Sequence, residues 1–140
     1  MKLARRTAII TAIATVVGGS TLALAGPASA TESVGPVAKY NGACGAGHKV
    51  IDSADMENLG TTFLTYNKTT GENCVVTVRA SAGAPVYMFA SLSSELEGKA
   101  TDSGRFTTYA GPVYLHAPGQ CVTWEGGITT YSTKGTGHCG

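Results

Sequence analysis

The sequence lacks a hydrophobic run long enough to cross a membrane. Its apolar stretch Ala8–Val17 stops at Gly18, whereas a spanning helix needs about 20 apolar residues. A basic segment, residues 1–6, precedes this stretch, and the small residues Ala28-Ser29-Ala30 follow it. This order is typical of a secretory signal peptide. We predict that residues 1–30 are an export signal cleaved after Ala30, and that the general secretory route is used, because the twin-arginine motif is incomplete. With no second hydrophobic segment, we expect no membrane contact after cleavage.

The mature part also lacks an excess of basic residues. Charged residues make up only 14% of the chain, and three of its ten lysines and arginines lie in the export signal, which leaves seven against nine aspartates and glutamates. Nucleic acids and anionic membranes are bound through a basic footprint. We therefore expect neither as a partner, and we expect a monomer.

The cysteines are few and widely spaced. The close pairs usual in zinc sites are absent, and none of the four cysteines Cys44, Cys74, Cys121 and Cys139 is left over as a catalytic thiol. An exported chain meets an oxidising compartment, so two disulfides are expected. Of the three pairings that four cysteines allow, we favour Cys44–Cys74 and Cys121–Cys139, because they close the smaller loops. We expect no metal and no cofactor.

Motifs of known hydrolases are missing from the mature chain. No G-x-S-x-G or H-E-x-x-H sequence occurs, and the histidines His48, His116 and His138 are far apart in sequence. We interpret all three as structural or surface residues. An unrecognised hydrolase stays open as an alternative, since a fold can gather distant residues into one pocket.

Paired acidic residues give no clear catalytic pattern. Glycoside hydrolysis needs two carboxylates across a cleft. Glu95 and Glu97, and likewise Asp52 and Asp55, lie near each other, but we interpret them as solvated charges. Glu125 is the acid of most interest, although it has no obvious partner. The sequence therefore predicts a protein without catalytic residues.

No stretch of the mature chain predicts an amphipathic helix. The pattern is instead one of short runs rich in Val, Thr, Tyr and Phe, separated by turn residues. The expected strands are His48–Asp52, Thr61–Tyr66, Cys74–Ala80, Val86–Ser91, Arg105–Tyr109, Val113–Ala117, Cys121–Trp124 and Ile128–Tyr131. About seven to eight short strands predict an all-β fold, a small disulfide-braced β-sandwich or closed β-barrel.

The remaining segments are assigned to turns and to an arm. Turns are expected at residues 67–73, 102–104, 110–112 and 118–119, and single helical turns at Ser53–Leu59 and Ser93–Leu96. Cys74, Val76 and Val78 share one face of their expected strand, and Thr77 and Arg79 share the other, which predicts a half-buried strand. Residues 31–39 carry Gly and Pro without periodicity and are expected to form a flexible N-terminal arm. Residues 40–140 are expected to form a single β domain.

Aromatic residues make up only 7% of the chain, with one tryptophan. Flat aromatic faces can cover the apolar faces of a sugar ring, and the residues available for this are Trp124, Tyr66, Tyr87, Tyr109, Tyr114 and Tyr131. Core packing is the alternative and is favoured for most of them. The candidate ligand surface is assigned to Trp124, Tyr66, Tyr109 and Tyr114.

Several long strings resemble the spore-associated protein A family of small secreted actinomycete proteins. They are YNGACGAG (Tyr40–Gly47), FLTYNKTTGENCVVTVRA (Phe63–Ala80), TTYAGPVYLHAPGQCVTWEGGI (Thr107–Ile128) and the final HCG (His138–Gly140). The resemblance covers most of the mature chain and the contexts of all four cysteines, whereas residues 95–103 fit the family least well. It implies export and association with spores or the cell surface, and it carries over no catalytic residues.

Three functions follow from these observations. The first is a secreted, non-enzymatic protein of the spore or cell surface. The second is an extracellular module that binds spore-coat or cell-wall polysaccharide. The third is a secreted inhibitor or small-ligand carrier, which a deep apolar cleft would favour.

Overall fold

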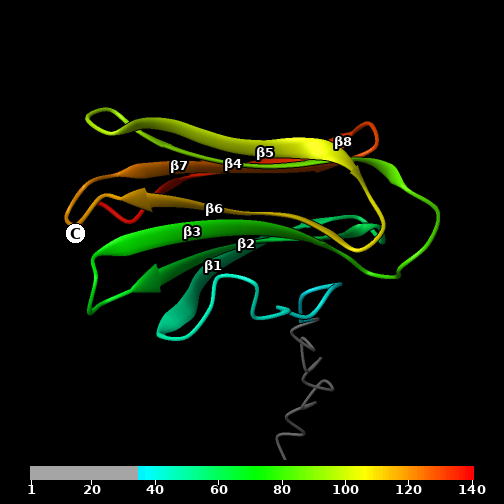
Figure 1. The fold of residues 1–140 in the computed structure, drawn as a ribbon, viewed down its shortest axis with the longest axis horizontal. Coiled ribbons are helices and arrows are strands. Elements are labelled where there is room, and N and C mark those ends of the chain that lie inside the picture. The colour runs from blue at the N-terminus through cyan, green and yellow to red at the C-terminus, as the bar shows by residue number, and fades with distance from the viewer. Residues whose placement is uncertain (1–34) are drawn as a thin grey trace, which may run out of the picture. The chain divides into compact units, whose positions relative to one another are not determined.

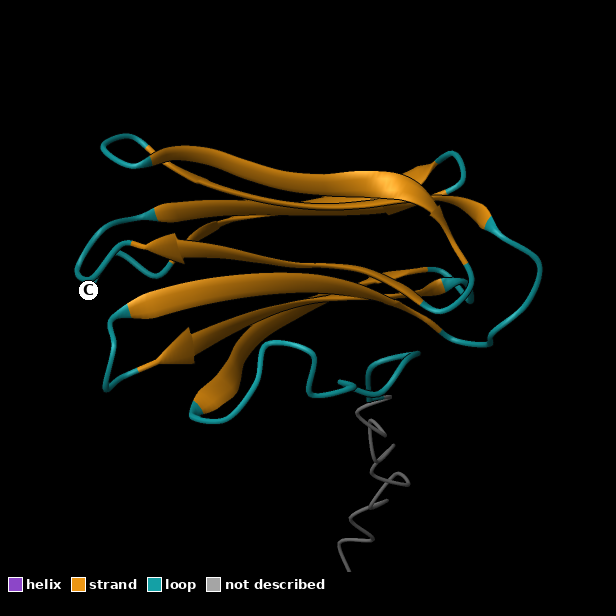
Figure 2. Ribbon diagram, in the orientation of Figure 1, coloured by secondary structure: helices purple, strands orange, loops and turns teal. Residues whose placement is uncertain are grey.

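The computed structural model describes residues 35–140, and all their regular secondary structure is β (Figure 2). The strands are β1 (His48–Met56), β2 (Gly60–Asn67), β3 (Glu72–Arg79), β4 (Val86–Ser94), β5 (Gly98–Phe106), β6 (Tyr109–His116), β7 (Val122–Ile128) and β8 (Tyr131–Gly137). None of these residues belongs to a helix that could cross a membrane. The predicted export signal at residues 1–30, and residues 31–34 of the predicted arm, lie outside the described part.

The strands form two antiparallel sheets that pack face to face (Figure 1). Sheet A has the order β1-β2-β3-β6, and sheet B has the order β5-β4-β7-β8. Each sheet ends in edge strands, so of the two expected architectures the fold is the β-sandwich and not the closed barrel. The chain crosses from one sheet to the other after β3, after β5 and after β6, so each sheet contains strands that are not consecutive in the sequence. Such crossings are common in β-sandwiches.

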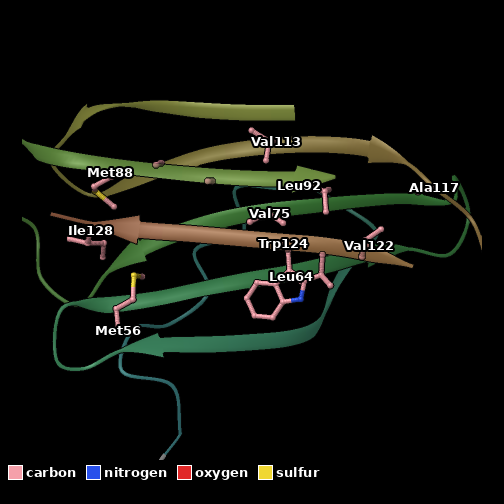
Figure 3. Packing of buried hydrophobic residues seen from close by; sticks show 12 residues of the cluster. Met56, Leu64, Val75, Met88, Leu92, Val113, Ala117, Val122, Trp124 and Ile128 are labelled. Carbon is pink, nitrogen blue, oxygen red and sulfur yellow. The ribbon is translucent and has the colours of Figure 1, made fainter. Parts of the chain in front are cut away.

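The main core lies between the two sheets. Successive side chains of a strand point to opposite faces, so Met88, Ala90 and Leu92 of β4 face inward together. They pack with Trp124 of β7 and Leu64 of β2, and all five are at most 2% exposed (Figure 3). Every second residue of these strands is therefore committed to the core.

Sheet A carries a second apolar layer on its outer face, where Phe63, Cys74, Val76 and Val78 cluster with Ala38 and Cys44. The prediction of a half-buried strand at Cys74–Ala80 was therefore wrong, because β3 is covered on both faces. The cover is the chain segment 35–47, which we call the N-terminal segment. Ala38 is 4% exposed, and its N–H donates to Thr61 Oγ1 at 2.9 Å. Within residues 35–39, expected to belong to a flexible arm, Ala38 thus packs against sheet A, whereas the other four residues are exposed.

Both predicted disulfides are confirmed. Cys44–Cys74 fastens the N-terminal segment to β3, with a Cα–Cα distance of 6.0 Å. Cys121–Cys139 joins the residue before β7 to the chain just after β8, with a Cα–Cα distance of 3.8 Å. The first bond therefore fixes the N-terminal segment to a central strand of sheet A. The second fixes the chain after β8 to the start of the neighbouring strand, β7.

The chain between residues 98 and 106 differs from the prediction. A turn was expected at residues 102–104, but these residues lie inside β5, which pairs with β4 from Val86↔Phe106 to Ser94↔Gly98 without a break. Pairing to an already buried neighbour outweighs the weak strand preference of Asp, Ser and Gly. Asp102 Oδ2 also accepts the N–H of Gly111 at 2.8 Å and so connects β5 to β6.

Residues 110–112 were also expected to form a turn, and they lie inside β6. Gly111 has φ +90° and precedes a cis peptide to Pro112, and the register against β3 shifts between Val75 and Thr77. This is a β-bulge in an edge strand, a place where proline costs no ladder hydrogen bond.

Three strand ends also differ from the prediction. The helical turns expected at Ser53–Leu59 and Ser93–Leu96 are not formed, because β1 continues to Met56 and β4 continues to Ser94. The strand expected at Ile128–Tyr131 is instead the hairpin turn between β7 and β8, where Thr129 has φ +57°. The turns predicted at residues 67–73 and 118–119 are present.

Candidate functional site

A polar cluster lies on the outer face of sheet A, beside the Cys44–Cys74 disulfide. The His48 side chain is 4% exposed, and its Nε2 lies 3.7 Å from Glu72 Oε2. Its Nδ1 lies 3.1 Å from Thr65 Oγ1, and its ring packs edge-on against Tyr114 with centroids 5.8 Å apart. A carboxylate, an imidazole and a hydroxyl thus form one row.

This row is poorly suited to nucleophilic catalysis. Thr65 has no exposed surface, and its hydroxyl donates to the carbonyl of Cys74 at 3.2 Å. A nucleophile must reach the substrate while a base accepts its proton. A substrate cannot reach Thr65, and the contacts of this row connect β1, β2 and β3 beside the disulfide.

Tyr40 joins this cluster from the N-terminal segment. Its ring packs edge-on against Phe63 at 5.6 Å, and its Oη accepts the N–H of Cys44 at 3.2 Å. Burial raises the pKa of the Tyr40 phenol, and the bond from Cys44 offsets part of this rise. Tyr114 Oη donates to the Cys44 carbonyl at 3.3 Å, so two tyrosines hold the disulfide loop in place.

The other two histidines lie apart from His48. His138 Nε2 is 2.9 Å from Asp52 Oδ2, which connects the chain after β8 to β1. His138 also lines a hollow of about 230 Å³, formed by Ile51, Tyr66, Asn73, Ala117, Gly119, His138 and Gly140. His116 is exposed at the end of β6. Among residues 35–140, no three His, Cys, Asp or Glu side chains are grouped so that they could hold a metal ion.

The four residues assigned to a ligand surface do not form one surface. Trp124 points into the core and is 2% exposed (Figure 3), so its assignment to a ligand surface was wrong. Its indole lies over Gly135 of β8, where an added Cβ would be 2.5 Å from Trp124 Cε2. Tyr66 lines the hollow near His138. Tyr109 and Tyr114 lie on the outer face of sheet A, opposite Val78 and Cys74 of β3.

The surface that sequence analysis missed is the outer face of sheet B, which we call the open face. No described segment packs over it, in contrast to sheet A. Its side chains alternate with the core residues of the same strands, and they are Tyr87, Phe89, Ser91, Ser93, Lys99, Thr101, Ser103, Arg105, Thr123, Glu125, Gly127, Ser132, Lys134 and Thr136. The alternation of Tyr87 and Phe89 with Met88 and Ala90 could have revealed it.

The open face carries aromatic rings at one end. Tyr87 is 51% exposed, and its ring centroid lies 6.5 Å from that of Phe89. Phe89 covers Gly127 on the neighbouring strand, where an added Cβ would lie 2.2 Å from Phe89 Cε1. The glycine therefore leaves room for the ring to lie close to the sheet, so that its other side is available to a ligand.

Charged residues cross the middle of the open face. Glu125 lies 3.1 Å from Lys134 and 3.9 Å from Lys99, and both lysine side chains are more than half exposed. Arg105 is the cross-strand partner of Tyr87, and its Nη2 donates to the Pro85 carbonyl at 2.7 Å. Such exposed ion pairs add little stability, so exchanging them for contacts with a ligand would cost little.

Hydroxyl groups and a hollow complete the open face. Ser91 pairs with Thr101, and Thr123 with Thr136, each at 3.0 Å between hydroxyl oxygens. At the end away from Tyr87, the face continues into a hollow of about 520 Å³ lined by Ser93, Ser94, Glu95, Leu96, Gln120, Cys121, Thr123 and Thr136. Hydroxyls, amides and carboxylates are the groups that bind sugar hydroxyls.

Comparison with known proteins gives one family. No protein-family model matches the chain, and no solved structure matches it. Spore-associated protein A of Streptomyces coelicolor is 43% identical to it over 122 residues, which cover 86% of this chain and 78% of that protein. This identity and coverage agree with the family that the sequence strings resemble. The chain described here belongs to the spore-associated protein A family.

Proposed function

We propose that this protein is secreted and acts, as a monomer, as a non-enzymatic component of the spore or cell surface. The observation that carries the proposal is the pair of disulfides, Cys44–Cys74 and Cys121–Cys139, in a chain related to a protein named for its association with spores. Disulfides persist in oxidising compartments outside the cytoplasm. The predicted signal at residues 1–30 supports the same location.

The covered outer face of sheet A and its disulfide support a role that requires a stable fold outside the cell. The N-terminal segment covers an outer face that would otherwise expose Phe63, Val76 and Val78 to water, and Cys44–Cys74 fastens that cover. A disulfide closing a loop of about 30 residues stabilises the folded state by roughly 3.6 kcal/mol in the chain-entropy model. A protein that must last outside the cell gains from both.

A non-catalytic role is supported by the histidines. His48 has the carboxylate partner and hydroxyl neighbour of a catalytic row, but Thr65 has no exposed surface. His138 pairs with Asp52, and no serine, threonine or cysteine side chain is found bonded to it among the described residues. The geometry therefore favours structural roles for both.

Cell fractionation tests this proposal. Culture fluid, washed mycelium and washed spores of the producing organism are probed with an antibody, and the intact mass of the recovered protein is measured. We expect a product that begins at Thr31, carries two disulfides and is enriched on washed spores or cell walls. A full-length cytoplasmic protein with four free thiols would contradict the proposal.

A second candidate function is binding to cell-wall or other polysaccharide, and the open face favours it. This face combines an exposed aromatic, Tyr87, with rows of hydroxyls and the hollow at Ser93. Pull-down on insoluble peptidoglycan, chitin and cellulose tests this candidate. Recovery of the protein on none of them would contradict it for these three polymers.

A further inference from the structure

We propose that the open face binds an extended polysaccharide whose sugar rings carry carboxylate groups, with a ring stacked on Tyr87 and its carboxylate at Arg105. This inference rests on the second candidate function and names its ligand class. Four features of the face support it: its length, its chemistry, its charge and the position of the aromatic rings beside a cation.

The length of the face suits a polymer. Tyr87, Phe89, Ser91 and Ser93 lie on the outer side of β4, with Ser91 only 2% exposed. The six steps from residue 87 to residue 93, at about 3.3 Å each, span roughly 20 Å. No described segment crosses this line. A ligand lying along β4 would therefore meet Tyr87 and Phe89 at one end, charged side chains of the neighbouring strands in the middle, and Ser93 at the other end.

The chemistry of the face suits a sugar more than a protein partner. Apart from Tyr87 and Phe89, its side chains are hydroxyls and charges, and it carries no aliphatic side chain. The buried centre of a protein interface is depleted of charged residues. A hydroxylated ligand instead finds partners on every strand of sheet B.

The charge of the face differs in sign from the rest of the domain. It carries Lys99, Arg105 and Lys134 against one carboxylate, Glu125. The other described residues carry four lysines and arginines against seven aspartates and glutamates. A ligand with negative charge is therefore attracted to this face and repelled by the remaining surface.

The size of this charge argues against nucleic acid. A DNA duplex carries one negative charge for about every 1.7 Å of its length, whereas the open face offers a net charge of two over roughly 20 Å. A polysaccharide with one carboxylate on a sugar has a much lower charge density. It fits the spacing of isolated cations on different strands.

The position of Arg105 favours a ligand whose carboxylate is attached directly to the sugar ring. Arg105 and Tyr87 are direct cross-strand partners, and such partners have Cβ atoms about 5 Å apart. A sugar stacked on Tyr87 would hold a ring carboxylate within reach of the guanidinium, which binds carboxylates through its planar fork. Glu95 lines the hollow at the other end of the face, so the carboxylate is expected at Arg105 and not there.

Affinity measurements on the purified mature protein test the inference. The probe is polygalacturonate, in which each sugar carries a carboxylate, and dextran is the neutral comparison. We expect binding to polygalacturonate that weakens as salt is raised and little binding to dextran. Tyr87→Ala is expected to weaken binding about tenfold, because it removes the stacking surface. Arg105→Gln should weaken binding and lower its salt dependence, of which Lys99 and Lys134 keep a part.

Matched variants separate the open face from the rest of the surface. Tyr109→Ala removes a tyrosine of similar exposure from the outer face of sheet A, and Lys49→Gln removes a cation from β1. Both should leave binding unchanged. Thermal unfolding of each variant checks that the fold is kept, and Tyr87→Phe, which keeps the ring, should restore binding if stacking is the cause.

The outcomes are distinguishable. Equal binding to dextran, tighter binding to a phosphate-bearing teichoic acid, or equal binding to duplex DNA would each overturn the carboxylate assignment. Loss of binding in Tyr109→Ala but not in Tyr87→Ala would overturn the assignment to the open face. A protein that binds chitin or peptidoglycan but not polygalacturonate would overturn this inference and leave the second candidate function intact.

Discussion

The ring of Phe89 covers Gly127, its cross-strand partner on the outer face of sheet B. On the inner face of the same sheet, the ring of Trp124 covers Gly135 in the same way. Each glycine leaves the space into which an aromatic ring of the next strand folds, an arrangement known to rescue glycines in sheets. The two pairs place one ring in the core and one at the surface.

Gly127→Ala should displace the Phe89 ring. Gly127 has an ordinary backbone conformation, but an added Cβ would lie 2.2 Å from Phe89 Cε1. The ring must swing outward, and we expect the free energy of unfolding to fall by about 1–2 kcal/mol. Urea denaturation measures this. Gly137→Ala is the control, because nothing lies within 4 Å of a Cβ there, and a loss of the same size in that variant would contradict the explanation.

Trp124→Ala should be strongly destabilising. The indole is 2% exposed between the sheets, and truncation of a buried tryptophan typically costs about 3–5 kcal/mol. Denaturation followed by far-UV circular dichroism measures this loss, since the variant has no tryptophan fluorescence. Tyr131→Ala, at a position 44% exposed, should cost less than about 1 kcal/mol. Similar costs for the two variants would place Trp124 at the surface.

Removal of the Cys44–Cys74 disulfide should loosen the N-terminal segment before the sandwich unfolds. We expect the double variant Cys44→Ser, Cys74→Ser to lose about 2–4 kcal/mol of stability. Limited proteolysis should then cut within residues 35–47, which cover sheet A. Serines at Cys121 and Cys139 should leave this segment protected. Cleavage elsewhere first would show that the segment does not depend on its disulfide.

Tyr40 should make stability fall at alkaline pH. Burial raises the pKa of its phenol in the folded state above the ordinary value of 10.0, so the unfolded chain loses this proton first. The contribution is complete below pH 10 and is lost as the pH rises through the folded pKa. Urea denaturation between pH 8 and pH 11 measures this.

Tyr40→Phe tests the assignment of this pH dependence. The variant should show a flatter decline above pH 10, because it has no phenol to titrate at this partly buried position. Tyr131→Phe, at an exposed position, should keep the decline of the parent protein. An unchanged slope in Tyr40→Phe would assign the alkaline effect to other tyrosines.

Much of the fold could be read from the sequence. The hairpin at residues 67–73, the short strands and the pairing of the cysteines by loop size are all local features, and the structure confirms them. The strand at residues 98–106 could not be read, because Asp102, Ser103 and Gly104 resemble a turn. It forms because β4 offers a complete row of backbone partners.

The candidate site shows the same division. Along β7, the apolar Val122 and Trp124 alternate with the polar Thr123 and Glu125. This alternation is visible in the sequence and would have assigned Trp124 to the core face, if the strand expected at Cys121–Trp124 had been extended to Ile128. The row of His48, Thr65 and Glu72 was not visible, because it brings together three strands that pair only in the folded sheet.

The sequence alone determined that this chain builds strands with two kinds of face and closes them with two disulfides, because alternation and cysteine spacing are properties of neighbouring residues. The tertiary structure decided which faces are covered. Strand β3 is buried on both sides because residues 35–47 return across it, whereas sheet B keeps an outer face open. A two-residue period sorts side chains into two sets, but only packing from elsewhere in the chain determines whether a set is buried or meets solvent.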